Sequence, residues 1–393
     1  MRLQPASFAM AALLTAMVAI APLSTDMYLP ALPAIGAHLG ASTADVQLTL
    51  SVYLIGFAVA QLIVGPLSDR AGRRPVLVGG LIVFVLTSIA CLLSNTIILL
   101  IVARFFQALG ACTGAAVGRA VVRDIHEPKN AARLLAHMGS AMAIGPLVAP
   151  LIGGQLTAAF GWQANFALLT IMGALVLVLA TLTLPETHTR PDFNALSPRR
   201  MIANYTCLSL NRQYRTFVLV NGFSFAGLFA FISGSSFVLI DSLGMTPETF
   251  GFAFAVSVLG YITGTQLAAR LLKSNEIEAL ITIGGRIGLI AGLVGVLTAW
   301  LAPTSVSAVI VPMFFYALSV GFVMPNSMAG ALGPFPQMAG AASAFMGFIQ
   351  MALAACFGAV VGWAYNGTSL PMMMTIATCG LIAWAFSLRI KQT

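Results

Sequence analysis

Charged residues are scarce in this chain of 393 residues. Only 8% of its residues are charged, whereas 59% are hydrophobic, and a typical soluble domain is about 25% charged. A chain of this composition cannot bury all of its apolar side chains within itself, so we expect a lipid bilayer to surround it. The apolar stretches are continuous and do not alternate with polar residues, which excludes the strand pattern of membrane β-barrels. The composition therefore predicts an all-α membrane protein.

Residues that commonly carry enzyme chemistry are also few. The four histidines are scattered, and the five cysteines lack the spacing of metal or redox sites. The chain has no phosphate-binding loop of the form GxxxxGKS or GxxxxGKT. We therefore expect no catalytic residue, no cofactor and no metal site. A membrane enzyme or a non-transporting receptor is the weaker alternative.

Twelve apolar stretches are each close to the roughly 20 residues that cross a bilayer as a helix. They cover residues 8–29, 46–66, 76–94, 98–120, 134–157, 164–184, 215–239, 249–271, 278–301, 306–328, 337–362 and 371–389. One connection between them is long, polar and basic. We therefore expect an N-terminal six-helix half at 1–184, a cytoplasmic linker at 185–214 and a C-terminal six-helix half at 215–393.

The basic residues are distributed unevenly between the two sets of predicted loops. If the N-terminus is cytoplasmic, every Lys and Arg except Arg104 and Arg286 falls in loops, tails or the adjoining span ends on the cytoplasmic side. This is the positive-inside bias of membrane proteins, and it predicts that both termini are cytoplasmic. The net charge of +8 therefore indicates topology, and we expect no nucleic-acid partner.

Residues 65–75 read GPLSDRAGRRP and place an acid and three arginines between two apolar stretches. We expect Gly65 and Pro66 to end one helix and Gly72 to allow a tight turn. Asp69 can pair with a neighbouring arginine or with a helix amino terminus. A charged turn that only anchors the topology is the alternative.

This hairpin resembles the loop signature of the major facilitator superfamily of secondary transporters. The resemblance implies twelve helices in two pseudo-symmetric halves of six, with a substrate site between the halves that opens alternately to each side of the membrane. It also implies that ion pairs of the hairpin latch the cytoplasmic side and break when that side opens. The gate residues are then Gly65, Asp69, Arg70, Gly72, Arg73 and Arg74.

The fifth predicted span contains the sequence GSAMAIGPLVAPLIGG at residues 139–154. Glycine and proline here remove side chains and a backbone donor, which predicts close packing and a bend. A kinked packing helix is one interpretation. The pattern also resembles the motif of antiporters within the superfamily, which favours export over uptake. The motif residues are Gly145, Pro146, Gly153 and Gly154.

Asp26 is the only acid that we place in the interior of a span, and Arg104 lies inside the fourth span. Burial disfavours the charged form of a carboxylic acid, so Asp26 can carry a proton reversibly near neutral pH. An Arg within the bilayer costs at least about 2.5–3.5 kcal/mol, so Arg104 should face the protein interior. We expect the two to form a charge pair that couples protons to transport. An interfacial acid and a snorkelling arginine are the alternatives.

Three short sequences narrow the resemblance to one branch. STDMYLPALP at 24–33, GWQANF at 161–166 and LPET at 184–187 resemble the bicyclomycin-resistance (Bcr/CflA) branch of drug:proton antiporters. The resemblance implies export of amphipathic drugs or small metabolites in exchange for protons across a bacterial inner membrane, and our default expectation is a monomer. An uptake symporter or facilitator of a small nutrient on the same fold is the alternative.

Aromatic and amide side chains repeat at helical spacing in several spans. Tyr53, Phe57 and Gln61 lie four residues apart, as Asn221 and Phe225 do, so each set shares a helix face. Such faces suit a drug-sized apolar ligand with hydrogen-bonding groups, although they also occur in helix packing. The candidate substrate-binding residues are Tyr28, Tyr53, Phe57, Gln61, Gln107, Asn221, Phe225 and Asn326.

Overall fold

The computed structural model describes residues 8–188 and 191–390, except for some side chains between 128 and 143. All regular structure in these ranges is helical. The first part contains α1 (Phe8–Asp26), the 3-10 turn η1 (Leu29–Ala31), α2 (Leu32–Leu39), α3 (Thr43–Ala71), α4 (Arg73–Leu92), α5 (Ile97–Ile125), α6 (Pro128–Phe160) and α7 (Gln163–Thr183). The second contains α8 (Pro198–Leu210), α9 (Arg212–Ser236), the π-helical turn η2 (Phe237–Ser242), α10 (Pro247–Leu271), α11 (Ile277–Leu301), α12 (Ser307–Leu332), the 3-10 turn η3 (Pro336–Met338), α13 (Ala339–Ala364) and α14 (Leu370–Ile390).

Eleven helical segments of the described residues are long and apolar enough to cross a membrane. The predicted span 134–157 lies within α6, which is 33 residues long. Within α6, the segment Ile144–Phe160 is apolar but shorter than the eleven candidate spans, so it is not counted among them. The prediction of a many-span, all-α membrane protein is therefore confirmed.

Two predicted span boundaries are wrong. The first span does not end at residue 29 but continues through η1 and α2 to Leu39. The second helix does not end at Gly65 and Pro66 but continues to Ala71, and the turn follows at Gly72, whose φ is +98°. The proline is tolerated because the carbonyl it frees one turn earlier, that of Leu62, accepts a hydrogen bond from Tyr205 Oη of α8 (3.3 Å).

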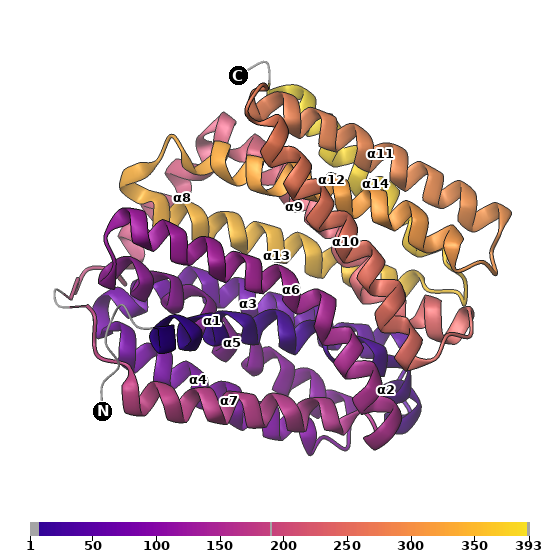
Figure 1. Cartoon of the computed structure of the whole chain (residues 1–393), viewed down its shortest axis with the longest axis horizontal. Helices are drawn as coiled ribbons and strands as arrows, with labels where there is room; N and C mark the ends of the chain where they lie inside the picture. The colour runs from indigo at the N-terminus through magenta and orange to yellow at the C-terminus, as the bar shows by residue number, and fades with distance from the viewer. Residues whose placement is uncertain (1–7, 189–190, 391–393) are drawn as a thin grey trace.

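The helices form two groups that lie against each other (Figure 1). Helices α1–α7 make one group and α9–α14 make the other, and the groups meet where α3 packs on α13 and α6 packs on α10. The turn η1 adds contacts with α9 and α10. Because η1 follows α1, these contacts join the groups at the end predicted to face outside.

The two groups share a local packing pattern that reflects their pseudo-symmetry. A Cβ added to Gly56 of α3 would meet the Phe105 carbonyl of α5, and one added to Gly260 of α10 would meet the Phe314 carbonyl of α12. Both sites carry two consecutive phenylalanines in edge-to-face contact at an interplanar angle of 87°. The absent side chains let the helices approach closely, as small residues do in membrane bundles.

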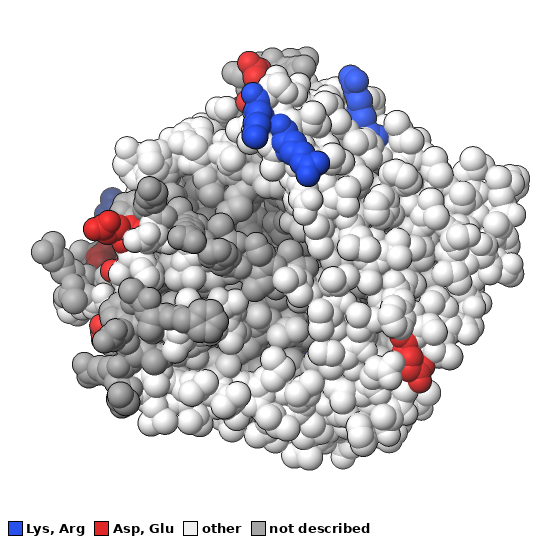
Figure 2. All heavy atoms as spheres, in the orientation of Figure 1, with Lys and Arg blue, Asp and Glu red and all other residues white. Residues whose placement is uncertain are grey.

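Charged side chains are sparse on the face of the molecule shown in Figure 2. In Figure 2, Lys and Arg lie along the upper and left margins of the face shown, and uncharged side chains cover most of the remainder. This distribution follows the sidedness predicted from the loops, although the orientation in the membrane stays a prediction.

Candidate proton-coupling site and cytoplasmic hairpin

Arg104 lies fully buried (0% exposed) inside the first group of helices. Its Nη1 donates to the Ser24 carbonyl (2.9 Å) and to Gln107 Oε1 (2.5 Å). The guanidinium carbon lies 4.4 Å from the ring centroid of Tyr28 and 4.2 Å from that of Tyr53. Such cation–π contacts are strongest when they are removed from water. Arg104 therefore faces the protein interior, and the snorkelling alternative is excluded.

Hydroxyl and amide groups hold the side chains around Arg104 in place. The hydrogen bonds are Ser24 Oγ with Tyr53 Oη (2.6 Å), Tyr28 Oη with Thr49 Oγ1 (2.9 Å), and Gln107 Nε2 to Ser88 Oγ (2.8 Å). The Nε and Nη2 groups of Arg104 have no hydrogen-bond partner among the described residues. The cluster therefore retains two buried N–H groups that can donate hydrogen bonds to a new acceptor.

Asp26 is the last residue of α1 and is 5% exposed. Its carboxyl group makes no hydrogen bond or ion pair within the described residues. The apolar segment that contains Asp26 continues through η1 and α2 to Leu39, which favours a position of Asp26 within the membrane over the interfacial alternative. Burying an unpaired carboxylate is costly, whereas the neutral acid is tolerated far better.

The predicted charge pair between Asp26 and Arg104 is absent from this conformation. Arg104 instead binds the main-chain carbonyl of Ser24, two residues before Asp26. The physical reason is that two tyrosine rings and an amide already surround the guanidinium group. The two residues are therefore connected through the end of α1 and not through a direct ion pair.

Two glycines of α6 bring three elements together beside Asp26. A Cβ on Gly153 would meet the carbonyl of Met27, and a Cβ on Gly154 would meet that of Pro247 at the start of α10. Nearby, Ser236 Oγ of α9 donates to the Leu29 carbonyl of η1 (2.5 Å). These contacts join the two groups of helices, so the end predicted to face outside is closed in this structure.

The hairpin residues form ion pairs within the first group of helices. Arg73 pairs with Asp69 of α3 (2.5 Å) and with Asp124 of α5 (3.0 Å). Arg70 is exposed. The resemblance implied a latch that breaks when the cytoplasmic side opens. Here the ion pairs are formed although the opposite end is closed, and they join α3, α4 and α5 of one group.

Glu186 follows α7 and completes the hairpin. Its carboxylate accepts hydrogen bonds from the backbone N–H groups of Arg73 (2.9 Å) and Arg74 (3.1 Å). Partial burial acts to raise the pKa of Glu186, but these donors and the N–H groups of Thr187 and His188 outweigh it, so the pKa lies below its ordinary value. Gly72 is required here because its φ of +98° is a conformation that residues with a side chain rarely adopt, and the absent side chain leaves room for the Glu186 carboxylate.

The eight predicted substrate residues fall into separate sets. Tyr28, Tyr53 and Gln107 surround Arg104, as described above. Asn221 Nδ2 donates to Gln350 Oε1 (2.7 Å), and Asn326 Nδ2 donates to the Phe322 carbonyl of its own helix (2.7 Å). The remaining three are Phe57, which is buried, and Gln61 and Phe225, which are partly exposed.

Sequence reasoning missed several of the groups that build these sites. Ser24, Thr49 and Ser88 look like ordinary hydroxyl residues of apolar helices, and no sequence signal separates them from others. Asp124 and Glu186 were detectable, because each is an acid beside basic residues or within a resemblance motif. Among the described residues, no three His, Cys, Asp or Glu side chains gather as a metal-binding group.

Comparison with known proteins gives consistent matches over most of the chain. A family model described as Major Facilitator Superfamily matches residues 14–359. The chain is 32% identical over 381 residues to the uncharacterized MFS-type transporter YdgK of Bacillus subtilis, with 96% of this chain and 94% of the relative covered. It is 30% identical over 371 residues to the bicyclomycin resistance protein homolog of Haemophilus influenzae, with 92% and 91% covered.

Two further matches support the same family and fold. The chain is 29% identical over 339 residues to multidrug resistance protein D of Escherichia coli, with 86% of this chain and 84% of the relative covered. The crystal structure of a POT family transporter in complex with a thioalcohol-conjugated peptide superposes with a TM-score of 0.78 at 13% identity, covering 98% and 95% of the two chains. This structural likeness concerns the fold alone.

Proposed function

This chain belongs to the major facilitator superfamily, in its bicyclomycin-resistance branch, and on that premise we propose that it exports amphipathic drugs or small metabolites in exchange for protons. It is a multi-pass membrane protein of a transporter family. The names of its relatives, which refer to bicyclomycin and multidrug resistance, support export. We place it in a bacterial inner membrane with both termini cytoplasmic.

One observation carries this proposal: a buried, unpartnered carboxyl group at Asp26 lies two residues from the carbonyl that Arg104 binds. A protonated Asp26 suits this buried position, whereas a carboxylate requires a partner or water. Loss of the proton therefore favours movement of the end of α1. The free N–H groups of Arg104 are available to the carboxylate or to a substrate.

The transport cycle then follows from where Asp26 exchanges its proton. With the outer end closed, Asp26 releases its proton toward the cytoplasm and drug binds between the halves. After the halves rock about the central site, Asp26 takes a proton from outside and drug leaves. Gln61 and Phe225, which are partly exposed in α3 and α9, are the candidates to contact drug directly, while Tyr28, Tyr53 and Gln107 hold Arg104.

Inverted membrane vesicles with an acidic lumen test the direction of coupling. Addition of drug to vesicles containing the wild-type protein should make the lumen more alkaline, and Asp26→Asn should abolish this signal. Asp241→Asn is the matched control, because Asp241 is an exposed acid at the end of η2 and should transport normally. Luminal acidification by drug would indicate symport, and no proton movement despite drug binding would indicate a facilitator or receptor.

A further inference from the structure

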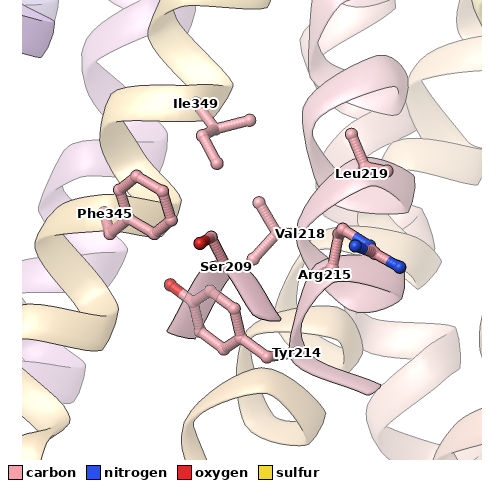
Figure 3. A pocket seen from close by; sticks show the side chains of 7 residues that line it. All are labelled: Ser209, Tyr214, Arg215, Val218, Leu219, Phe345 and Ile349. Atoms are coloured by element: carbon pink, nitrogen blue, oxygen red, sulfur yellow. The ribbon is translucent and has the colours of Figure 1, made fainter. Parts of the chain in front are cut away.

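A pocket of ≈ 190 Å³ lies in the second group of helices, at the end predicted to face the cytoplasm (Figure 3). It is bounded by α8, α9 and α13. Its volume is below the about 300–1,000 Å³ of pockets for drug-sized ligands, so a narrower ligand suits it. The lining residues are Ser209, Tyr214, Arg215, Val218, Leu219, Phe345 and Ile349.

The walls of this pocket are mainly hydrocarbon. In Figure 3, Phe345 and Ile349 of α13 project toward Val218 of α9 across an open space. The one phenol in the lining is already used, because Tyr214 Oη donates to the Ala342 carbonyl (2.6 Å). A wall of this kind favours an alkyl chain over a polar ligand, because polar groups entering it would lose their hydrogen bonds to water.

Two arginines lie at the same end of the molecule as this pocket. Figure 3 shows the guanidinium group of Arg215 turned away from Phe345, and this side chain is exposed. Arg389 of α14, also exposed, lies over Phe386 (5.3 Å), whose ring stacks on Phe223 of α9 (6.2 Å). Both arginines lie on the cytoplasmic side of this stack, since α9 begins and α14 ends there. Neither has an acidic partner within the described residues.

The helix that closes the pocket has the character of a membrane-surface helix. Arg199 and Arg200 occupy the first turn of α8, and its apolar residues Ile202 and Leu210 are 65% and 74% exposed. A basic helix with an exposed apolar face lies in the plane of the membrane interface. Ser209 of this helix lines the pocket, which places the pocket opening at the depth of the lipid headgroups.

We propose that this pocket binds one acyl chain of an anionic phospholipid from the cytoplasmic leaflet, with its phosphate held by Arg215, which lines the pocket. The apolar walls accommodate the chain, and the unpaired guanidinium group matches the headgroup charge. The lipid would also act on the contact between the two halves. Phe345 of the pocket wall stacks on Tyr205 (5.3 Å), which donates to Leu62 of α3 (3.3 Å).

Native mass spectrometry of the purified protein tests this proposal. The protein is equilibrated with phosphatidylglycerol or phosphatidylcholine of identical acyl chains, and the lipid retained per protein is measured. We expect the wild type to retain phosphatidylglycerol about tenfold more strongly. Arg215→Gln should reduce this preference markedly, and Ile349→Trp should remove the retained lipid because the indole fills the pocket.

Arg270→Gln, a change of an exposed arginine at the end of α10, is the matched charge control and should behave as the wild type. If Ile349→Trp does not give a single folded species, Leu219→Trp narrows the same pocket from a half-buried position. Equal retention of the two lipids by the wild type, or wild-type retention by both pocket and arginine variants, would overturn the proposal. This result is independent of drug transport.

Discussion

Arg104 is the largest fully buried side chain of the described residues, and its surroundings show the limit of reasoning from single positions. The cost of an arginine in lipid predicts that it is buried, and helical spacing predicts its contact with Gln107. Its other partners come from α1 and α3, which are distant in sequence. Because only one acid lies in the interior of a predicted span, we expected it to form an ion pair with Arg104. In the structure, aromatic rings and carbonyl oxygens instead supply the negative charge density around the guanidinium group.

The Arg104 site also breaks the pseudo-symmetry of the two halves. The sequence RFFQAL at 104–109 corresponds to MFFYAL at 313–318, so Met313 and Tyr316 replace Arg104 and Gln107. Tyr316 Oη donates to the Ser224 carbonyl of α9 (3.4 Å), which parallels the bond from Arg104 to the Ser24 carbonyl of α1 (2.9 Å). At this pair of equivalent positions, a charged side chain therefore occurs only in the half that contains Asp26. This supports the assignment of proton coupling to that half.

Glu186 provides a prediction about pH at the level of one residue. Because its pKa in the folded protein is below the ordinary value of 4.5, its ionised form stabilises the hairpin above that pH, and this contribution is lost as the pH falls through the lower folded-state pKa. We expect Glu186→Gln to lower the thermal unfolding midpoint at pH 7, by an amount limited by the exposure of the side chain.

The measurement is thermal unfolding of both proteins in detergent between about pH 3 and 8, a range that spans the ordinary pKa of a glutamate. The midpoints of wild type and Glu186→Gln should converge below pH 4.5. A constant difference across the whole range would show that the backbone donors do not depend on the charge of Glu186.

At the scale of helices, hydropathy predicted most of the architecture. Eleven apolar segments were found near the expected positions, because long apolar helices are set by bilayer thickness. The errors arose where tertiary contacts override local signals. Pro66 normally favours a helix end, yet α3 continues because Tyr205 satisfies the freed carbonyl. Helix α8 lies in a stretch expected to be linker, since a short amphipathic helix gives little hydropathy signal.

The substrate faces show the same limit for helix contacts. Spacing correctly indicates which residues share a face, but not which neighbour that face meets. Tyr53 is directed at Arg104 in its own half, whereas the side chain of Gln61, two turns later, lies where a Cβ on Gly347 of α13 would be. The predicted face of α3 therefore contacts its own half at Tyr53 and the other half at Gln61.

The glycines of α6 give a prediction at this scale. Gly154→Ala should weaken the closed outer end, because the added methyl group would overlap the Pro247 carbonyl of the other half, and overpacking typically costs about 1–3 kcal/mol. We expect slower drug-driven proton movement and greater labelling of a cysteine introduced at Leu29, which is fully buried beneath this contact.

Gly139→Ala is the control within the same helix, since an added Cβ there would have no neighbour within 4 Å. It should leave both transport and labelling unchanged. Equal effects of the two substitutions would mean that helix propensity, and not the contact between the halves, explains the result.

For the whole molecule, the account combines a closed outer end with a buried, unpaired acid beside it. The contacts of η1 with α9 and of Gly154 with Pro247 close that end. Sequence alone could not predict this state, because alternating access uses the same residues in each conformation. The sequence does single out Asp26 as the candidate coupling acid, since it is the only acid in the interior of a predicted span.

The most direct test of this account is the affinity of the purified protein for a transported drug as a function of pH. Exchange requires that proton and drug oppose each other at equilibrium, and such coupling is reciprocal. Drug binding by the wild type should therefore weaken as the pH is lowered, while binding by Asp26→Asn should not change with pH. The same pH dependence in both proteins would contradict the assignment of proton coupling to Asp26.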